Sequence, residues 1–572
     1  MHADIDNANA VLVSSRHQGT TSPGYDDNQA PGVKDNASGR HSFVLLAGIA
    51  CTVLGAKLIA ISCLASSIPI ADQWDGEAVN LYVPYLQGTL SFGDLFAPHN
   101  EHRIFVFRIL SLIHLELAGE WNTRLEMIFG AFVHTAAITW LAALLMPVVA
   151  AHRRIILASF VAFLFALPIG YENMLTGFQS QVYLMLLFGI AALAACSTAR
   201  AFSVRWFCGL AAAILSYLSF ATGVATIIAV GGLMVLQMLT KARPRSGREY
   251  AAVALMAFAV LAIVVWTASS AHPLSTPWTV VQGVLLLGAR VIVAFVPVFW
   301  FCRYTIGRRP VVDDRAWVIV GISAWIAIQV AMLAYGRGNT IAVRYFDILL
   351  FIYPVAVVAI FAFIDKARAT RYGRFAVTGA VAWMFTVVTA CAAVGYLFVL
   401  GAVDWSRAAT QEADNVRTYF TTSNLDDLKK FGHGHTFDLA YPNSDRQAKI
   451  LSNPDVRAIL PPEFRPLDAD NAAVRKRMVT KGEFAGVTAT AVHFVLSLGP
   501  ALLALGIGSF FAVGTRLCLS DERTRLLGER PTLRSSDEEP ALKGPSHTAV
   551  ITPSASESTS EPITEFSPQR LG

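Results

Sequence analysis

Long apolar runs, separated by short polar connections, make up most of the chain. The first run covers residues 43–65, contains Lys57 as its one charged residue, and is long enough for a transmembrane helix, which needs about 20 residues. Comparable runs follow at 124–150, 155–169, 181–197, 206–221, 223–239, 250–270, 278–301, 316–335, 346–364, 375–402 and 484–515. The pattern predicts an all-α polytopic membrane protein with about twelve transmembrane helices.

The composition agrees with this pattern. Hydrophobic residues make up 54% of the 572 residues and charged residues 15%, and the mean hydropathy is +0.51, which excludes a water-soluble globule. The seven cysteines lie within or at the ends of apolar runs, so neither a disulfide framework nor a metal cluster is visible. We expect the lipid bilayer as a partner and no nucleic acid.

Polar segments divide the chain into parts. Residues 1–41 contain no apolar run and no cleavable signal, and residues 516–572 are rich in Ser, Thr, Pro and Glu, so both are predicted to be disordered cytoplasmic tails. Between them we expect a transmembrane core at 42–403 and a last transmembrane helix at 484–515. Residues 404–483 are polar, and their strand-like and helical pieces predict a small extracytoplasmic α/β insertion.

Basic residues determine the predicted orientation, because Lys and Arg concentrate in cytoplasmic loops. The most basic short loops include 151–154, 198–205 and 240–248. We therefore expect these loops and both termini on the cytoplasmic side of the inner membrane. Residues 206–239 could form one long helix or a two-helix hairpin, and the basic flanks on both sides favour the hairpin. With a hairpin there, the loop 66–123 and the insertion face outward.

The outer loop 66–123 contains a dense polar segment, DQWDGEAVNLYVPYLQGTLSFGDLFAPHNEHR, at 72–103. Its titratable and charged residues are Asp72, Asp75, Glu77, Asp94, His99, Glu101, His102 and Arg103. A carboxylate there could take a proton and a cation could hold a departing phosphate. This is the chemistry of group transfer from a lipid-linked donor.

Asp75 is the preferred general base in this segment. Trp74 and the adjacent membrane would partly desolvate its carboxylate, and Gly76 leaves room for a substrate. Glu77 is the alternative base. Asp72 and Asp75 could instead cap a short helix that begins near Gly76.

Arginines on the outer face run against the positive-inside trend and call for a physical reason. They are Arg103, Arg108, Arg124, Arg337 and Arg344. Arginine contacts phosphate oxygens at two points, which suits a lipid phosphate leaving group. The structural alternatives are interfacial snorkelling or ion pairs with Glu101, Glu120 or Glu126. Together, Arg337 and Arg344 favour a function.

Other polar residues complete the predicted site. Glu172 and Gln179 could form a sugar-binding cluster, or Glu172 could be the counter-ion of an arginine. His99, Glu101 and His102 could bind a divalent metal, but a spacing of three in an irregular loop is weak support, so we assign no metal and expect no required cofactor. The residues predicted to bind substrate are Glu101, His102, Arg103, Arg124, Glu172, Gln179, Arg337, Arg344 and Tyr345.

Polar residues inside the apolar runs are few and scattered; they are Lys57, His134, Arg290 and Gln329. A transporter would more typically show paired broken helices in two repeated halves, with charges near the midplane. Here the charges gather at one surface, which favours an enzyme.

Seven short motifs carry a resemblance to a known family. They are WDGE at 74–77, PHNEHRI at 98–104, WNTR at 121–124, ENMLTGFQSQ at 172–181, SFATG at 219–223, YGRGNTIAVRY at 335–345 and LPPEFR at 460–465. With these motifs, most of residues 43–515 resembles a group of bacterial multi-pass membrane proteins similar to the GT-C glycosyltransferases, the superfamily of protein mannosyltransferases and aminoarabinose transferases.

The resemblance implies a GT-C-like fold, an acidic catalytic residue in the first outer loop, a polyprenyl-phosphate-linked sugar donor and inversion at the anomeric carbon. Two departures are visible: Gly76 separates Asp75 from Glu77, and Val343 precedes the Arg344–Tyr345 pair where a serine is expected. We expect transfer of a sugar to an extracytoplasmic glycan or lipid acceptor. The alternatives are a non-catalytic carrier or flippase of a lipid-linked glycan, and a glycan polymerase or ligase.

Overall fold

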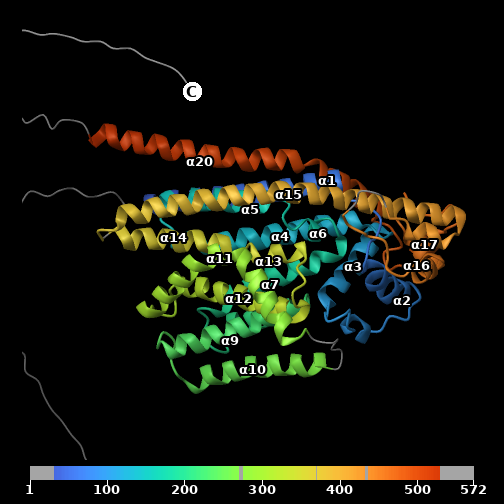
Figure 1. Cartoon of the computed structure of the whole chain (residues 1–572), viewed down its shortest axis with the longest axis horizontal. Coiled ribbons are helices and arrows are strands. Elements are labelled where there is room, and N and C mark those ends of the chain that lie inside the picture. The colour runs from blue at the N-terminus through green and yellow to red at the C-terminus, as the bar shows by residue number, and fades with distance from the viewer. Residues whose placement is uncertain (1–30, 269–274, 369, 432–435, 529–572) are drawn as a thin grey trace, which may run out of the picture. The chain divides into compact units, whose positions relative to one another are not determined.

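The structure of the chain, a computed structural model, describes residues 31–268, 275–368, 370–431 and 436–528 (Figure 1). Within these ranges the regular secondary structure is helical and contains no strand, which confirms the predicted all-α class. Most of the two predicted tails lies outside the described residues.

Ten helical stretches in the described ranges are long and apolar enough to cross a membrane, so the chain is a multi-pass membrane protein. The helices concerned are α1 (Pro31–Leu64), α4 (Thr123–Leu145), α7 (Ser180–Cys196), α9 (Val224–Leu239), α10 (Gly247–Ala268), α11 (Pro277–Arg308), α12 (Ala316–Arg337), α14 (Ile352–Arg368), α15 (Gly373–Thr422) and α20 (Gly499–Gly528).

The other predicted runs form shorter helices. The runs at 155–169 and 206–221 become α5 (Arg154–Ala166) and α8 (Val204–Tyr217), and the run at 484–515 is divided between α19 (Ala485–Ser497) and α20. A total of twelve spans therefore stays a prediction.

Short helices connect the long ones. They are η1 (Trp74–Tyr82), α2 (Val83–Leu86), η2 (Gly93–Phe96), α3 (Phe105–Ala118), η3 (Met146–Val148), η4 (Ala151–Arg153), α6 (Tyr171–Met174), η5 (Gly177–Gln179), η6 (Ala221–Gly223), η7 (Val343–Tyr345) and α13 (Phe346–Leu349). η1 is a π-helix, a rare form that often marks functional sites. It contains the WDGE motif.

Residues 206–239 form a hairpin, as the basic flanks predict. Near the turn, the Ser216 hydroxyl of α8 lies 3.0 Å from the Thr226 hydroxyl of α9. At the far end of α9, Gln237 Nε2 donates to the Ser197 carbonyl (2.8 Å), in the connection that leads into α8. The two helices are therefore antiparallel.

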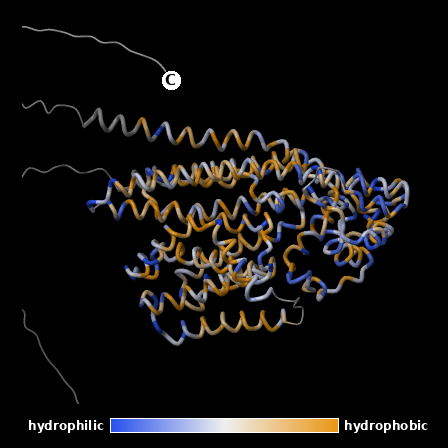
Figure 2. The backbone as a smooth tube through the Cα atoms, in the orientation of Figure 1, coloured by the Kyte–Doolittle hydropathy of each residue, from blue (hydrophilic) through white to orange (hydrophobic). Residues whose placement is uncertain are grey.

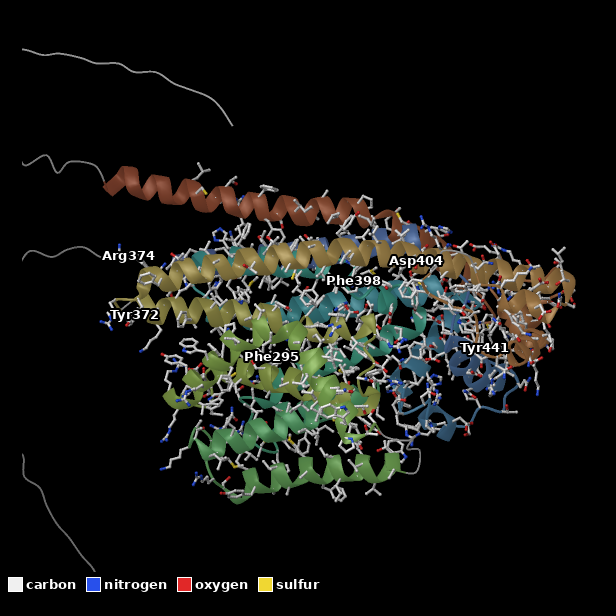
Figure 3. All side chains as sticks on the ribbon, in the orientation of Figure 1. Phe295, Tyr372, Arg374, Phe398, Asp404 and Tyr441 are labelled. Carbon is white, nitrogen blue, oxygen red and sulfur yellow. The ribbon has the colours of Figure 1, made fainter. Side chains whose placement is uncertain are left out.

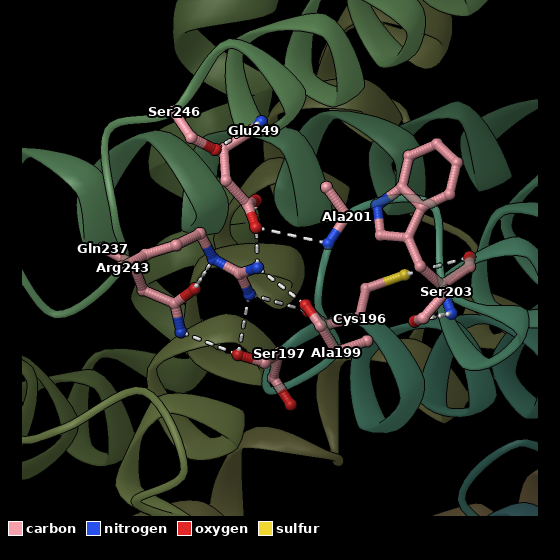
Figure 4. A network of polar contacts seen from close by, with 10 residues as sticks. Cys196, Ser197, Ala199, Ala201, Ser203, Gln237, Arg243, Ser246 and Glu249 are labelled. Carbon is pink, nitrogen blue, oxygen red and sulfur yellow. Dashed lines mark hydrogen bonds and ion pairs between the residues drawn. The ribbon is translucent and has the colours of Figure 1, made fainter. Parts of the chain in front are cut away.

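Arg243 joins two of the predicted cytoplasmic loops at one end of the bundle (Figure 4). Its Nη1 donates to the Ala199 carbonyl (2.6 Å) and lies 3.1 Å from Glu249 Oε2, and its Nε donates to Gln237 Oε1 (2.9 Å). These contacts satisfy a buried guanidinium and give it a structural role. The loops 198–205 and 240–248 thus share one end, as the predicted alternation requires.

Helix α15 is much longer than the run at 375–402 that predicted it. Its 50 residues span about 75 Å at 1.5 Å per residue, whereas the hydrocarbon core of a bilayer is about 30 Å thick. The helix therefore extends well beyond the membrane. Figure 3 shows Arg374 near its first end and Asp404 far along it, toward Tyr441. Hydrophilic residues gather near the ends of the long helices (Figure 2).

The α/β insertion expected at 404–483 is wrong, because its described residues contain helices and no strand. They hold the end of α15, η8 (Leu425–Lys429), α16 (Ser444–Leu451), α17 (Pro454–Ile459) and α18 (Asn471–Arg475).

The insertion packs against the outer loop 66–123, and the two share one apolar cluster. Trp74 and Tyr82 of the loop are buried in it together with Val416, Leu451 and Ile459 of the insertion. Polar contacts reinforce the packing at several points, such as the hydrogen bond from the Trp121 amide to the Ile459 carbonyl (2.6 Å). The two predicted outer segments therefore form one packed unit, which we call the outer unit.

Candidate functional site

A small cavity lies where the outer unit meets the loops that follow α5 and α12. It has a volume of about 40 Å³, enough for a few water molecules. Its walls are formed by Ile70, Ala71, Asp72, Glu172, Thr176, Phe178, Gln179, Arg344 and Trp405. Three residues predicted to bind substrate, Glu172, Gln179 and Arg344, thus converge here from distant parts of the sequence.

Local backbone geometry builds the cavity. Ala71 has φ +48°, a left-handed conformation that is uncommon for a residue with a side chain, and it directly precedes Asp72. In η5, a Cβ atom at Gly177 would lie 2.2 Å from Glu126 Oε2. Only glycine therefore lets η5 lie this close to α4. The position of η5 in turn sets the position of Gln179, its last residue.

Asp72 is the most accessible carboxylate at the cavity, with 56% of its side chain exposed. His99 Nε2 lies 4.0 Å from Asp72 Oδ2, and this imidazole holds the pKa of Asp72 below its ordinary value, with a smaller contribution from Arg344. Asp72 is therefore ionised at neutral pH. From the sequence, Asp75 and not Asp72 is the preferred base.

Glu172 and Arg344 face one another across the same cavity. The backbone amide of Arg344 donates to Glu172 Oε2 (3.3 Å). Burial raises the pKa of Glu172, while the Arg344 guanidinium acts in the opposite direction. Within the described ranges, the Arg344 guanidinium forms no ion pair; it lies 5.8 Å from the centroid of the Tyr345 ring, and Tyr345 itself is buried.

Asp75, the predicted base, is engaged by the insertion. Arg446 Nε donates to its Oδ1 (2.8 Å), and the Tyr441 hydroxyl donates to its Oδ2. Burial, and then the neighbouring Asp75 carboxylate, raise the pKa of Tyr441 to about 12, so this hydroxyl stays protonated. Sequence reasoning missed both partners, although Arg446 is another cation on the predicted outer face.

Glu77, the alternative base, is fully enclosed. Its carboxylate accepts hydrogen bonds from Gln73 (2.7 Å), Ser111 (3.0 Å) and Tyr82 (3.1 Å). The Gln73 amide and the Tyr82 hydroxyl also contact Glu126, so two buried carboxyl groups share two donors. Burial raises the pKa of Glu77. Its surroundings suit a structural role in this conformation.

The other predicted substrate residues have protein partners. Arg337 forms an ion pair with Glu101, and Arg124 Nη1 lies 3.5 Å from Glu463 Oε1. Arg103 lies 5.0 Å from the centroid of the Trp266 ring. Both Arg124 and Arg337 thus form ion pairs, which is one of the structural alternatives that the sequence raised. Arg337 pairs with Glu101, as that alternative named, whereas the partner of Arg124, Glu463, was not predicted.

Arg108, also among the outer arginines, has a structural role as well. Its Nη1 donates to the carbonyls of Asp94 (2.8 Å), Leu95 (3.2 Å) and Ala97 (2.6 Å). One buried guanidinium therefore fixes the loop that leads to the PHNEHRI motif.

His102, predicted to bind substrate, does not line the cavity. Its ring stacks on Phe220 with centroids 4.1 Å apart, and its Nδ1 accepts from the Ala221 amide (3.3 Å). Burial lowers its pKa to about 4, so the ring is neutral at physiological pH. His99 and His102 also pair through their backbones (2.9 Å). In the described part of the chain, no three side chains of metal-binding type converge.

Comparison with known proteins found no matching family model, no similar curated protein and no similar solved structure. The resemblance of the motifs to GT-C glycosyltransferases therefore stays a prediction. A functional assignment has to be drawn from the cavity and the residues around it.

Proposed function

We propose that the chain is a membrane glycosyltransferase that moves a sugar from a polyprenyl-phosphate donor to a glycan or lipid acceptor on the outer face of the inner membrane. The observation that carries this proposal is the cavity lined by Asp72, Glu172 and Arg344, in which the positive charge of Arg344 acts to lower the pKa of both carboxyl groups. A cation stabilises the anionic leaving group of such a reaction, and a carboxylate stabilises the positive charge that develops on the sugar ring. The reaction therefore needs both kinds of charge in one site.

In the proposed reaction Asp72 removes the proton of the acceptor hydroxyl. The acceptor oxygen forms a bond to the anomeric carbon, and the bond from that carbon to the donor phosphate oxygen breaks on the opposite face, with inversion. Arg344 holds the departing polyprenyl phosphate through two hydrogen bonds, and Glu172 stabilises the oxocarbenium-like sugar. We assign proton removal to Asp72 in place of Asp75 because Asp72 lines the cavity, whereas both oxygens of Asp75 have partners.

The cavity must enlarge for this reaction. Ligand sites typically have volumes of about 300–1,000 Å³, and the present volume is about 40 Å³. The insertion is the natural moving part, because Trp405 lines the cavity and Tyr441 and Arg446 contact the outer loop.

Three conservative variants test the assignment in proteoliposomes supplied with synthetic polyprenyl-phosphate hexoses. Asp72→Asn keeps the shape and removes the base, so turnover should fall by about 10²–10⁴-fold, the usual contribution of general-base catalysis. Asp75→Asn and Glu77→Gln should lose much less. If Asp75→Asn is inactive while Asp72→Asn has normal activity, Asp75 is the general base, as the sequence predicts. If all three variants transfer sugar normally, the general base lies elsewhere in the chain. If the unaltered protein transfers no sugar, a carrier or flippase becomes the better assignment.

A further inference from the structure

The backbone of Arg344 is held by two consecutive residues of α6. Its amide donates to the Glu172 carboxylate (3.3 Å), and its carbonyl accepts from Asn173 Nδ2 (2.8 Å). Asn173 is 2% exposed, so this second hydrogen bond is shielded from water. The orientation of Arg344 toward the cavity therefore depends on where α6 holds the Asn173 amide.

Asp347 in turn fixes the Asn173 amide. Asn173 Nδ2 also donates to Asp347 Oδ2 (2.8 Å), and the Tyr183 hydroxyl donates to the same oxygen (3.1 Å). The carboxylate lies directly on the backbone before α6, because a Cβ atom at Gly170 would lie 2.1 Å from Asp347 Oδ2. Asp347 thus joins α6, α7 and α13 beneath the cavity without lining it.

A carboxylate buried among membrane helices is unfavourable without a counter-charge. Lys57 of α1 supplies one: it is buried, it interacts electrostatically with Asp347, and its Nζ lies 5.5 Å from the centroid of the Tyr183 ring. Lys57 forms no ion pair within 4.0 Å with any described carboxylate. The hydrogen bonds to Asp347 Oδ2 therefore come from Asn173 and Tyr183.

We infer that Asp347 is a positioning residue for Arg344, acting through Asn173, and that Lys57 is the counter-charge of Asp347. The inference rests on the proposed function, in which Arg344 binds the donor phosphate. It also gives a role to Lys57, one of the scattered polar residues within the apolar runs. The lysine would support the site from inside the membrane without touching a substrate.

Hydrogen exchange tests the positioning without any substrate. Asp347→Asn replaces an acceptor with an amide that opposes the Asn173 amide, so peptides covering 343–346 and 171–174 should exchange faster. Gln329→Leu is the matched control, because Gln329 is also a fully buried polar residue of the bundle but contacts neither α6 nor η7 in the hydrogen-bond network. Unchanged protection in Asp347→Asn, or equal loss in Gln329→Leu, would overturn the inference.

A second variant guards against misfolding. Asp347→Asn alone leaves Lys57 without its counter-charge, whereas Lys57→Met with Asp347→Asn removes both charges. The double variant should recover expression and thermal stability yet still show the faster exchange at 343–346. Recovery of normal exchange there would mean that charge balance, and not the contact with Asn173, governs Arg344.

A double-mutant cycle on binding of a short-chain prenyl phosphate then measures the coupling. Asp347→Asn should weaken binding about tenfold, which is what one buried hydrogen bond typically contributes, and should have no further effect in an Arg344→Ala background. Additive losses would contradict an action through Arg344. If the unaltered protein fails to bind this probe, the donor of the proposed function is wrong, while hydrogen exchange still decides the positioning.

Discussion

Arg337 ends α12 and Arg344 lies in η7, within the same predicted outer segment, but the two have different surroundings. Arg337 pairs with Glu101, whereas Arg344 lines a cavity that two carboxylates also line. The sequence predicted both as phosphate ligands, because both oppose the positive-inside trend. The structure is needed to distinguish an arginine that stabilises the protein from one that is available to a ligand.

Arg344→Lys tests this distinction. Lysine keeps the charge but cannot make a planar two-point contact, so binding of a short-chain prenyl phosphate should weaken by about 10–100-fold, the value of one charged hydrogen bond. The matched control is Arg337→Lys, which should leave the affinity nearly unchanged. Isothermal titration with detergent-solubilised protein measures both. Equal affinity of Arg344→Lys and the unaltered protein would exclude the bidentate contact.

Glu77 should make stability depend on pH. Burial raises its pKa in the folded state above the ordinary value of 4.5, so the folded state retains a proton that the unfolded state releases. The contribution of Glu77 to stability is therefore greatest below pH 4.5 and falls as the pH rises toward the folded-state pKa. Glu77→Gln should remove this component, whereas Glu483→Gln, at an exposed position, should not. Unfolding temperatures in detergent between pH 4.5 and 8 test this, and identical slopes for all three proteins would contradict it.

The part of the site that could be predicted consists of residues whose chemistry is unusual for their place in the chain. Glu172, Gln179 and Arg344 were identified in this way, and they converge. The partners of Asp75 could not be foreseen, because Tyr441 and Arg446 lie 366 and 371 residues away and no local pattern links them to WDGE. Without these contacts, Asp75 was preferred because of its neighbours Trp74 and Gly76.

Among the elements, the long apolar helices followed directly from the hydrophobic runs, because a bilayer fixes their length. The insertion was harder to predict, since its pieces are short and polar. A usable signal was nevertheless present: Asn443, Asn453 and Asp470 each cap the following helix through their side chains, and Pro454 occupies the first position of α17. Such caps mark helix starts in a sequence, and giving them more weight would have excluded strands.

Arg446 should help to keep the cavity closed. Arg446→Ala removes one of the two partners that join the insertion to Asp75, so a cysteine placed at the cavity wall by Thr176→Cys should react faster with a soluble maleimide. The control is Lys429→Ala, which breaks an ion pair with Asp426 that lies within η8. Equal reaction rates in the Arg446→Ala and Lys429→Ala backgrounds would mean that the contact of Arg446 with Asp75 does not hold the insertion in place.

For the molecule as a whole, two groups of contacts identify opposite ends of one helix. In η6, directly before α9, the Ala221 amide donates a hydrogen bond to His102 of the predicted outer loop. Beyond the last turn of α9, Arg243 joins the two basic loops. A membrane-spanning helix between these contacts would place the cavity and the basic loops on opposite sides of the bilayer. The positive-inside rule assigns the basic loops to the cytoplasmic side.

Cysteine labelling decides the orientation. In a variant lacking the seven native cysteines, Lys449→Cys on α16 and Ser246→Cys in the basic loop both present exposed positions. Because Lys and Arg concentrate on the cytoplasmic side, a membrane-impermeant maleimide should label Lys449→Cys in spheroplasts and Ser246→Cys only after the membrane is permeabilised. The reverse labelling pattern would invert the predicted topology and place the cavity on the cytoplasmic face. A sugar donor in the outer leaflet could then not reach Arg344. Labelling of both positions in intact spheroplasts would mean that α9 does not separate the two ends across a bilayer.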